Sequence, residues 1–372
     1  MPPFRKRALS TDPLIEKVIV STYTIPTGSP ESDGTLSWDH TTLVLVEVHA
    51  AGVTGLGFTY ADEATAKVIE QTLKKQVEKR SALSVNGPWM AMVRSIRNLG
   101  RPGICSMAIA AVDNALWDLK ARLLNVPLVT LLGQVHEAVE VYGSGGFTSY
   151  SIGQLQSQLG GWAQQGIKMV KMKVGTHPED DVRRVRAARA AIGADVELFV
   201  DVNGAYSRKQ ALEKAEQFAQ FGVRWFEEPV SSDDLDGLRL IRDRAPAQME
   251  IAAGEYGYDS WYFRTMLEVG AVDVLQADAT RCAGITGFLK AAALCEAQCM
   301  PLSAHTAPAM HLPVCCAAAP LRHLEYFFDH VRIEQMFFEG MPQPVNGKLF
   351  PDLSRPGNGL EFKRADAVRF AA

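Results

Sequence analysis

Short apolar runs alternate with amphipathic stretches from about residue 138 to residue 326. The amphipathic stretches, such as 180–191 and 208–221, have the periodicity of helices. The apolar runs that indicate strands are Val139–Tyr142, Lys168–Val174, Val196–Val202, Val223–Glu227, Glu250–Gly254, Val272–Gln276, Met300–Ala304 and Leu321–Tyr326. Eight strand–helix units in one series predict a closed parallel barrel rather than an open sheet.

The first part of the chain follows a different pattern. Residues 14–23, 41–48 and 55–60 alternate or are rich in β-branched and aromatic residues, which indicates strands. The helical segments that follow are 64–79, 87–99 and 106–124. Strands followed by helices predict a separate α+β domain. The tail from about residue 330 is rich in Pro and Gly, and we expect it to fold back over that domain.

The length and net charge of the chain indicate how many domains it has and which classes of partner are unfavourable. A chain of 372 residues exceeds the usual single domain. Its net charge of −4 argues against nucleic-acid and membrane partners. No apolar run approaches the ~20 residues of a membrane span. The N-terminal segment MPPFRKRALSTDP lacks the apolar core of a signal peptide, so we expect a cytoplasmic protein.

Three acidic residues stand where packing alone would not place them. Asp201, Glu227 and Glu255 each end an apolar strand run, and they are about 25–30 residues apart. In a strand–helix repeat this spacing brings them to one face of the barrel. Three carboxylates there predict one shared cation, and hard oxygen ligands suit Mg²⁺. Glu228 should face the other way by strand alternation, and we expect it to play a supporting or structural role.

Further polar groups stand at the ends of the other strands. They are Lys171, Lys173, Asn203, Asp278, His305 and Glu325. Taken singly, a strand-end aspartate is more often a helix N-cap, a paired lysine motif is usually a solvated edge, and a lone histidine is more often a hydrogen-bonded core residue. Because all of these groups converge on one barrel face, we favour a catalytic site there.

These residues carry a resemblance to a known family. The matching segments are KMKVG at 171–175, DVNGAY at 201–206, WFEEP at 225–229, GE at 254–255, D-x-T-R-x-x-G-I-T at 278–286, AH at 304–305 and HLEY at 323–326. With them, the chain resembles the mandelate racemase subgroup of the enolase superfamily over nearly its whole length. Ala277 and Ala283 depart from the family pattern, which often has Pro and Gly there, but neither position supplies a chemical group.

The resemblance implies a fold and a first chemical step. The fold is α/β, a modified TIM barrel of the (β/α)7β type at 131–328 with an α+β capping domain at 1–130. A C-terminal segment at 329–372 returns to that domain. The step is abstraction of the proton α to a carboxylate, via an enediolate, on a small carboxylic acid substrate. The cofactor is Mg²⁺, and the protein is expected to be a homo-oligomer, from dimer to octamer.

Roles follow for the remaining groups. Lys173 is expected to be one base, with its pKa lowered by the ammonium of Lys171 and by Mg²⁺. His305, oriented by Asp278, is expected to be the base on the opposite face of the substrate. Burial is expected to keep Glu325 protonated, as a hydrogen-bond donor to the substrate carboxylate.

The reaction after proton abstraction is open. Two opposed bases allow racemisation or epimerisation of a 2-hydroxy acid, whereas a histidine acting as an acid completes a dehydration. The polar loop at 24–40 favours dehydration of a sugar acid, aldonate or aldarate, to a 2-keto-3-deoxy acid. We expect Asn203, Asp33 and Trp38 to bind substrate, and the loop to close over the barrel together with residues 57–62. A non-catalytic metal-binding barrel would require the loss of a catalytic group, and none is missing.

Overall fold

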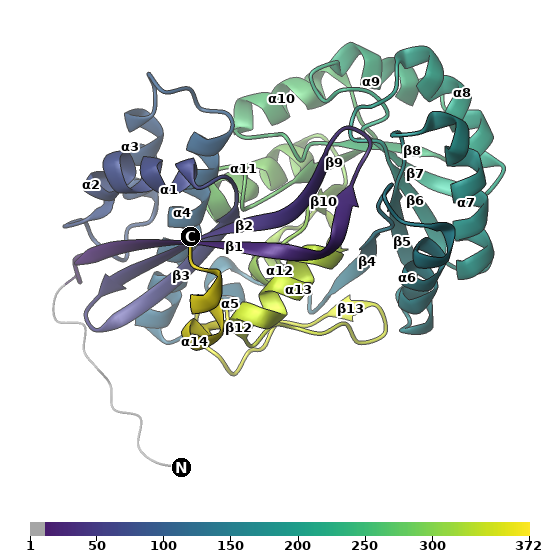
Figure 1. The fold of residues 1–372 in the computed structure, drawn as a ribbon. Helices are drawn as coiled ribbons and strands as arrows, with labels where there is room; N and C mark the ends of the chain where they lie inside the picture. Colours follow the sequence, from purple (N-terminus) through teal and green to yellow (C-terminus); the bar gives the residue numbers. More distant parts are fainter. Residues whose placement is uncertain (1–11) are drawn as a thin grey trace.

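Eight parallel strands form a closed barrel in the computed structural model, which describes residues 12–372 (Figure 1). The strands are β4 (Val139–Gly145), β5 (Met169–Lys173), β6 (Glu197–Asp201), β7 (Val223–Glu227), β8 (Glu250–Ala253), β9 (Val274–Ala277), β10 (Leu302–Ala304) and β11 (Leu321–Phe327). The ring closes because β11 pairs in parallel with β4. This confirms the predicted modified TIM barrel. Residues 1–11, on which the expectation of no signal peptide largely rests, lie outside the described residues.

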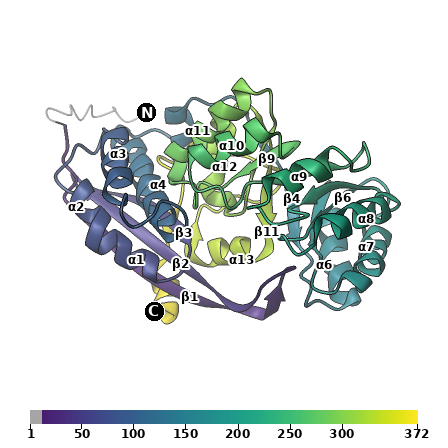
Figure 2. The ribbon, with the colours of Figure 1, turned by 90° about the horizontal axis from the view of Figure 1, so that it is seen from above.

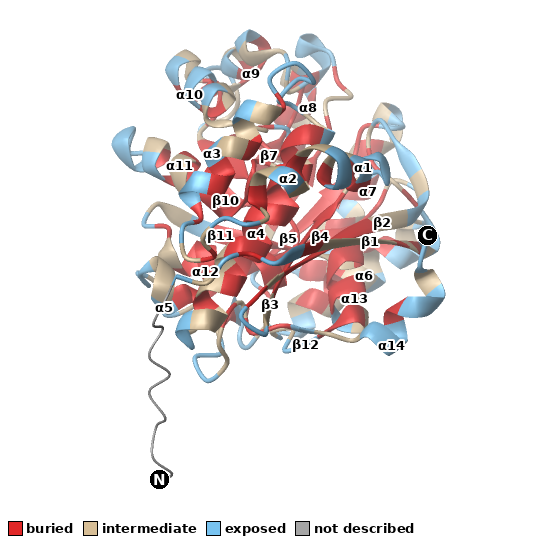
Figure 3. Ribbon diagram, turned by 90° about the vertical axis from the view of Figure 1, so that its left-hand side faces the viewer, coloured by how far each residue is buried: buried red, intermediate tan, exposed pale blue. Residues whose placement is uncertain are grey.

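Each barrel strand is followed by a helix. The helices are α6 (Ile152–Gln164), α7 (Pro178–Ile192), α8 (Arg208–Ala219), α9 (Leu235–Arg242), α10 (Ser260–Val269), α11 (Gly284–Ala297), α12 (Pro308–Ala317) and α13 (Phe328–Phe337). Their inner faces are buried and their outer faces exposed (Figure 3). Alternation along β5 sends Val170 and Met172 into this helical layer, so that Lys171 and Lys173 take the opposite face of the strand. No helix within residues 12–372 has the length and apolar character to cross a membrane.

A three-stranded antiparallel sheet and several helices form the capping domain. Its elements are β1 (Lys17–Ser32), β2 (Ser37–Ala50), β3 (Val53–Tyr60), α1 (Ala64–Val68), the π-helical turn η1 (Ile69–Leu73), α2 (Lys74–Val77), α3 (Asn86–Ser95), α4 (Ile104–Leu124) and α5 (Leu128–Leu132). Helix α4 packs closely on β3 at Gly55 and Gly57. A Cβ atom at either glycine would collide with the α4 backbone, so the close packing requires glycine there.

The polar segment at 24–40 is a β-hairpin arm, not the loop that we expected. β1 continues to Ser32 and β2 starts at Ser37, with pairs as far out as Glu31 and Trp38. The pairing is irregular between Pro26 and Glu31. Figure 2 shows the arm reaching from the capping domain toward the barrel. Because the arm has few apolar side chains, it lacks the alternation by which a strand is predicted, and backbone pairing forms it instead.

The C-terminal segment contacts both domains. Its elements are β12 (Phe338–Glu339), β13 (Lys348–Leu349), β14 (Glu361–Phe362), α14 (Arg364–Ala367) and the 3₁₀ turn η2 (Val368–Phe370). β13 adds to the edge of β4. Nη2 of Arg364 lies 2.7 Å from both carboxylate oxygens of Glu47 on β2. The N–H of Ala372 donates to Thr22 O of β1 at 3.1 Å.

Buried polar side chains of α4 hold the start of α11. Asp113 accepts hydrogen bonds from the N–H and the hydroxyl of Thr286, both at 2.8 Å. The adjacent Asn114 donates to Ala279 O at 3.0 Å. The first turn of α11 has no N-cap side chain of its own, so the capping domain satisfies these backbone groups. The same loop carries Asp278, which ties the position of that side chain to the capping domain.

The buried carboxyl of Asp113 should make stability depend on pH. Burial raises its pKa from the ordinary 3.8 to about 7. The folded protein therefore holds this proton more tightly than the unfolded chain, and the stabilisation is full below about pH 4 and is lost as the pH rises toward about 7. Relative to Asp113→Asn, the free energy of unfolding should fall over this range by up to about 4 kcal/mol in urea titrations. The exposed Asp195→Asn serves as control, and a difference independent of pH would contradict the prediction.

Candidate active site

Three buried carboxylates meet at the carboxyl ends of neighbouring strands. Asp201 ends β6, Glu227 ends β7, and Glu255 follows β8. Asp201 and Glu227 are partners in the strand register, which places them side by side. One oxygen from each of the three lies within 4.8 Å of the others. We call this group the carboxylate triad.

The carboxylate triad fits Mg²⁺ by its chemistry. All of its donors are hard carboxylate oxygens, which Mg²⁺ prefers. Burial, together with the charge of Asp201, raises the pKa of Glu227 to about 8. A divalent cation would offset both the cost of burying these charges and their mutual repulsion.

Both lysines of β5 point into this acidic site. Lys173 Nζ lies 2.5 Å from Asp201 Oδ2. Lys171 Nζ lies 2.5 Å from Glu227 Oε1 and 3.0 Å from Glu325 Oε1. Burial and Lys171 both lower the pKa of Lys173, but Asp201 outweighs them and the pKa is raised. The residues of the chain by themselves therefore raise the pKa of Lys173, whereas the sequence predicted a lowered pKa. The reason is that Lys173 is paired with Asp201, a carboxylate of the triad.

His305 and Asp278 form the predicted pair. His305 Nδ1 is hydrogen-bonded to Asp278 Oδ2 at 2.8 Å, which directs Nε2 into the site. Nε2 lies 3.2 Å from Glu255 Oε2. Burial lowers the pKa of His305, but the nearby carboxylates, first Glu255, raise it to about 9. His305 follows β10, and β11 and β4 separate β10 from β5, so His305 and Lys173 stand on different walls of the barrel.

The pKa of Glu325 on β11 is lowered, contrary to the expectation that burial keeps this side chain protonated. Burial raises its pKa as expected, but the cations Lys171 and His305 outweigh burial and lower the pKa below its ordinary value. Its Oε2 accepts a hydrogen bond from the N–H of Thr306 at 3.2 Å. Burial alone did not predict the direction of this pKa shift, because the pKa also depends on which charged groups the fold brings into contact with Glu325.

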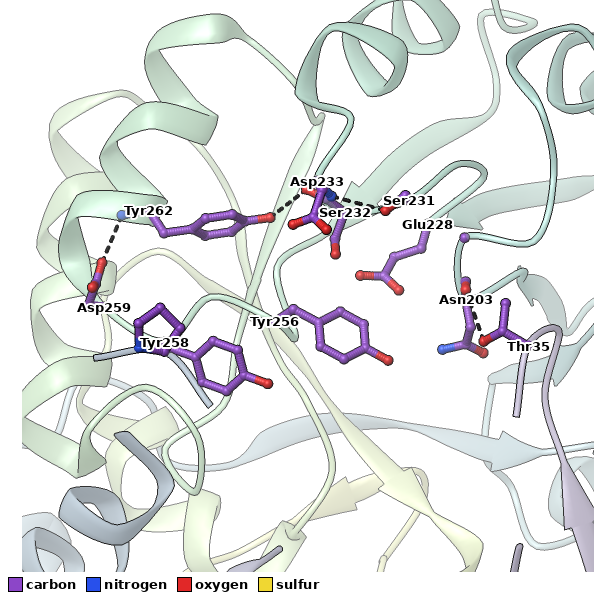
Figure 4. Close-up of a pocket in the computed structure, with 12 residues that line it drawn as sticks. Thr35, Asn203, Glu228, Ser231, Ser232, Asp233, Tyr256, Tyr258, Asp259 and Tyr262 are labelled. Atoms are coloured by element: carbon purple, nitrogen blue, oxygen red, sulfur yellow. Dashed lines mark hydrogen bonds between the residues drawn. The ribbon is translucent and has the colours of Figure 1, made fainter. Parts of the chain in front are cut away.

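A cavity of about 530 Å³ is lined by residues that closely follow the carboxylate triad in the sequence (Figure 4). Glu228 and Asn203 line it, so the expectation that Glu228 faces away is wrong. Glu228 has a φ of 40°, a left-handed conformation that breaks the alternation at the end of β7. Asn203 has a φ of 47° and likewise turns into the cavity. The remaining wall includes Tyr256 and Tyr258.

The hairpin arm reaches the cavity through Thr35, not through the residues expected to bind substrate. Asp33 Oδ1 accepts hydrogen bonds from the N–H groups of Thr35 and Leu36, both at 2.7 Å, and so holds the turn of the arm. Trp38 Nε1 donates to Glu31 Oε2 at 3.0 Å. Neither Asp33 nor Trp38 is among the residues that line the cavity, whereas Thr35 is.

Two known domain families together match almost the whole chain. "Mandelate racemase / muconate lactonizing enzyme, N-terminal domain" matches residues 17–133, and "Enolase C-terminal domain-like" matches residues 154–367. The chain belongs to the mandelate racemase subgroup of the enolase superfamily. This match confirms the resemblance that the sequence motifs indicated. The protein is an enzyme of this subgroup.

Individual relatives extend the likeness over the full length. A mandelate racemase/muconate lactonizing enzyme-like protein from Rubrobacter xylanophilus has a crystal structure that matches with a TM-score of 0.95 and 54% identity, covering 97% of this chain and 100% of that one. The 3,6-anhydro-α-L-galactonate cycloisomerase of Streptomyces coelicolor is 31% identical over 94% of this chain and 98% of its own. L-talarate/galactarate dehydratase from Salmonella typhimurium, in a crystal structure with Mg and L-lyxarohydroxamate, has a TM-score of 0.89 and 26% identity, covering 99% and 95% of the two chains.

Two further side chains of this subgroup member contact the carboxylate triad directly. Trp225 Nε1 donates to Glu227 Oε2 at 2.7 Å. Arg281 Nη1 lies 3.3 Å from Glu255 Oε1. Trp225 shares a strand face with Glu227 by the two-residue period, so the sequence held a signal for it. Arg281 stood within a matching segment, but nothing in the sequence gave it a role.

A buried histidine joins the loops that carry Asp278 and His305. His311 on α12 accepts a hydrogen bond at Nε2 from the N–H of Ala279 at 2.7 Å. Its Nδ1 donates to Ala307 O at 3.0 Å. His311 lies within a helix, away from any strand end, so the strand pattern gave no signal for it.

Proposed function

We propose that this enzyme is a Mg²⁺-dependent dehydratase of a sugar acid, with a 2-keto-3-deoxy acid as product. One observation carries the proposal. A two-base site, Lys173 with the pair of His305 and Asp278, adjoins a cavity lined mostly by residues that carry a hydroxyl, amide or carboxylate group. Polyhydroxylated acids need such walls. The cycloisomerase and dehydratase relatives, named for sugar acids, support the same class of substrate.

The carboxylate triad would hold the metal. When bound, Mg²⁺ supplies positive charge beside the substrate carboxylate and so favours the charge that develops there as the α-proton leaves. Lys171, which contacts Glu227 and Glu325, keeps a second positive charge at the same end of the site. Trp225 holds one carboxylate oxygen of Glu227 in place by a hydrogen bond.

The proton transfers fall to the two bases. Lys173 would lose its ion pair with Asp201 when a cation is held at that carboxylate, and this loss favours the neutral amine. The neutral Lys173 Nζ would then take the α-proton, and the electron pair of that C–H bond would move toward the substrate carboxylate. His305 Nε2 then donates a proton to the β-hydroxyl, which leaves as water when the C–O bond breaks. Asp278 accepts from Nδ1 and holds the imidazole in the orientation that presents Nε2 to the substrate. The resulting enol takes up a proton at the β-carbon to give the 2-keto-3-deoxy acid.

A second candidate is racemisation or epimerisation of a 2-hydroxy acid. The placement of Lys173 and His305 on different walls of the barrel favours it, because each base then reaches one face of the α-carbon. In that reaction His305 would return a proton to the α-carbon instead of protonating a leaving hydroxyl.

A screen of aldonic and aldaric acid diastereomers with Mg²⁺ tests the two candidates. Dehydration should give a 2-keto-3-deoxy acid, detected with semicarbazide and identified by NMR. Products that are only epimers or enantiomers would replace the dehydratase by the second candidate. The comparison variant is Lys173→Ala, which should convert the same acids about 10²- to 10⁴-fold more slowly than the unaltered enzyme.

Several expectations from the sequence stay predictions. They are the homo-oligomeric state, the absence of nucleic-acid and membrane partners, the cytoplasmic location, and substrate binding by Asp33 and Trp38. The geometry supports an indirect role for the last two, because they hold the arm that carries Thr35 to the cavity.

A further inference from the structure

Residues that follow the carboxylate triad in the sequence line the cavity. Asn203, Glu228 and Tyr256 line it, and each lies one or two residues beyond a triad carboxylate in the sequence. Figure 4 shows the side chains of Glu228 and Tyr256 directed into one open space, with Asn203 and Thr35 at its side. A ligand held at the triad by its carboxylate therefore has direct room for the rest of its chain in this cavity.

Two buried oxygens at the cavity have no hydrogen-bond partner. Glu228 is 1% exposed and its Oε1 is unpartnered, and Asn203 is 9% exposed and its Oδ1 is unpartnered. An unsatisfied buried polar atom costs free energy, so each of these oxygens favours a ligand that can exchange a hydrogen bond with it. Hydroxyl groups are donors, whereas an ionised carboxylate is an acceptor only.

The cavity wall offers no cation. None of the residues that line it, all within the described part of the chain, is a lysine, an arginine or a histidine. Arg281 Cζ lies 5.4 Å from the centre of the Tyr256 ring, and its guanidinium is already paired with Glu255 and Asp278. The wall also carries the carboxylate of Asp233. A second carboxylate of a ligand would therefore meet the negative charge of the wall without a cation to balance it, and only neutral hydroxyl and amide groups could pair with it.

The two buried acids of the hairpin arm, Asp33 and Glu31, already have hydrogen-bond partners within the arm. Asp33 is bonded to its own turn, and Glu31 accepts from the indole of Trp38. Thr35, at the cavity edge, adds a hydroxyl. Specificity for the far end of the substrate is thus expected from the cavity wall more than from the arm.

We propose that this cavity binds the neutral, polyhydroxylated tail of the substrate, so that the enzyme acts on monocarboxylic aldonates and discriminates against the dicarboxylic aldarates. The inference rests on the proposed function, which supplies the carboxylate at the triad. The tail hydroxyls donate to Glu228 and Asn203 and exchange hydrogen bonds with Tyr256 and Tyr258, while the reacting α-carbon stays at the two bases.

Matched pairs of acids test the proposal. Galactonate with galactarate, and gluconate with glucarate, differ only in the oxidation of the last carbon. With the Mg²⁺-loaded enzyme, kcat/KM should favour the aldonate of a converted pair by at least about tenfold, the effect of one uncompensated charge. Exchange of the α-proton in D₂O, followed by NMR, reports the first step separately from product formation.

A charge reversal provides the internal check. Asp233→Lys places a cation at the cavity, and it should shift the ratio of the two kcat/KM values toward the aldarate by at least about tenfold. Asp236→Lys on α9, equally exposed but not at the cavity, should leave the ratio unchanged. An aldarate preference in the unaltered enzyme, or equal shifts in both variants, would overturn the proposal. If no acid shows α-proton exchange, the proposed function itself fails; exchange without any preference defeats only the aldonate assignment.

Discussion

Asp201→Asn should lower the proposed dehydratase activity by about a thousandfold or more and should weaken Mg²⁺ binding strongly. Asp201 supplies one of the three clustered oxygens and is the carboxylate that pairs with Lys173. The amide keeps the size of the side chain but removes the charge that a divalent cation requires. Isothermal titration with MgCl₂ measures the affinity, and rates at increasing Mg²⁺ show how much activity the metal restores.

The exposed Asp195→Asn is the matched control for this experiment, because it makes the same chemical change away from the carboxylate triad. It should bind Mg²⁺ as the unaltered enzyme does. Unchanged Mg²⁺ affinity in Asp201→Asn would remove Asp201 from the metal site and leave the triad without its assigned function.

Loss of either base should be nearly as severe. Lys173→Ala and His305→Ala should each lower dehydration by about 10²- to 10⁴-fold, the usual contribution of a positioned acid or base. Because the two groups stand on different walls of the barrel, each single variant should keep α-proton exchange for one configuration of the α-carbon. The double variant should show none in D₂O, as followed by NMR.

Lys168→Ala, which changes an exposed lysine just before β5, controls for loss of a positive charge in this region. Circular dichroism should show that all the variants are folded. Exchange that persists in the double variant would require another base in the site.

The sequence by itself determined the barrel and most of the reactive groups. The two-residue period of a strand decides which side chains share a face, and the strand–helix spacing decides which strand ends meet. These local rules were enough to bring Asp201 and Glu227 together, and to place Lys171 beside Lys173. The resemblance to the family motifs, rather than these local rules, marked Asp278 and His305 as a pair.

Only the tertiary structure decided how these groups are charged and where several of them point. The left-handed φ of Glu228 turns it into the cavity, and no strand period predicts a conformation beyond the strand's last residue. Lys171, 3.0 Å away, lowers the pKa of Glu325, and Asp201 raises the pKa of Lys173. Asp33 binds its own turn. In each case the outcome depends on partners distant in the sequence or on backbone geometry outside a regular element, whereas a periodic pattern records only the face on which a side chain lies.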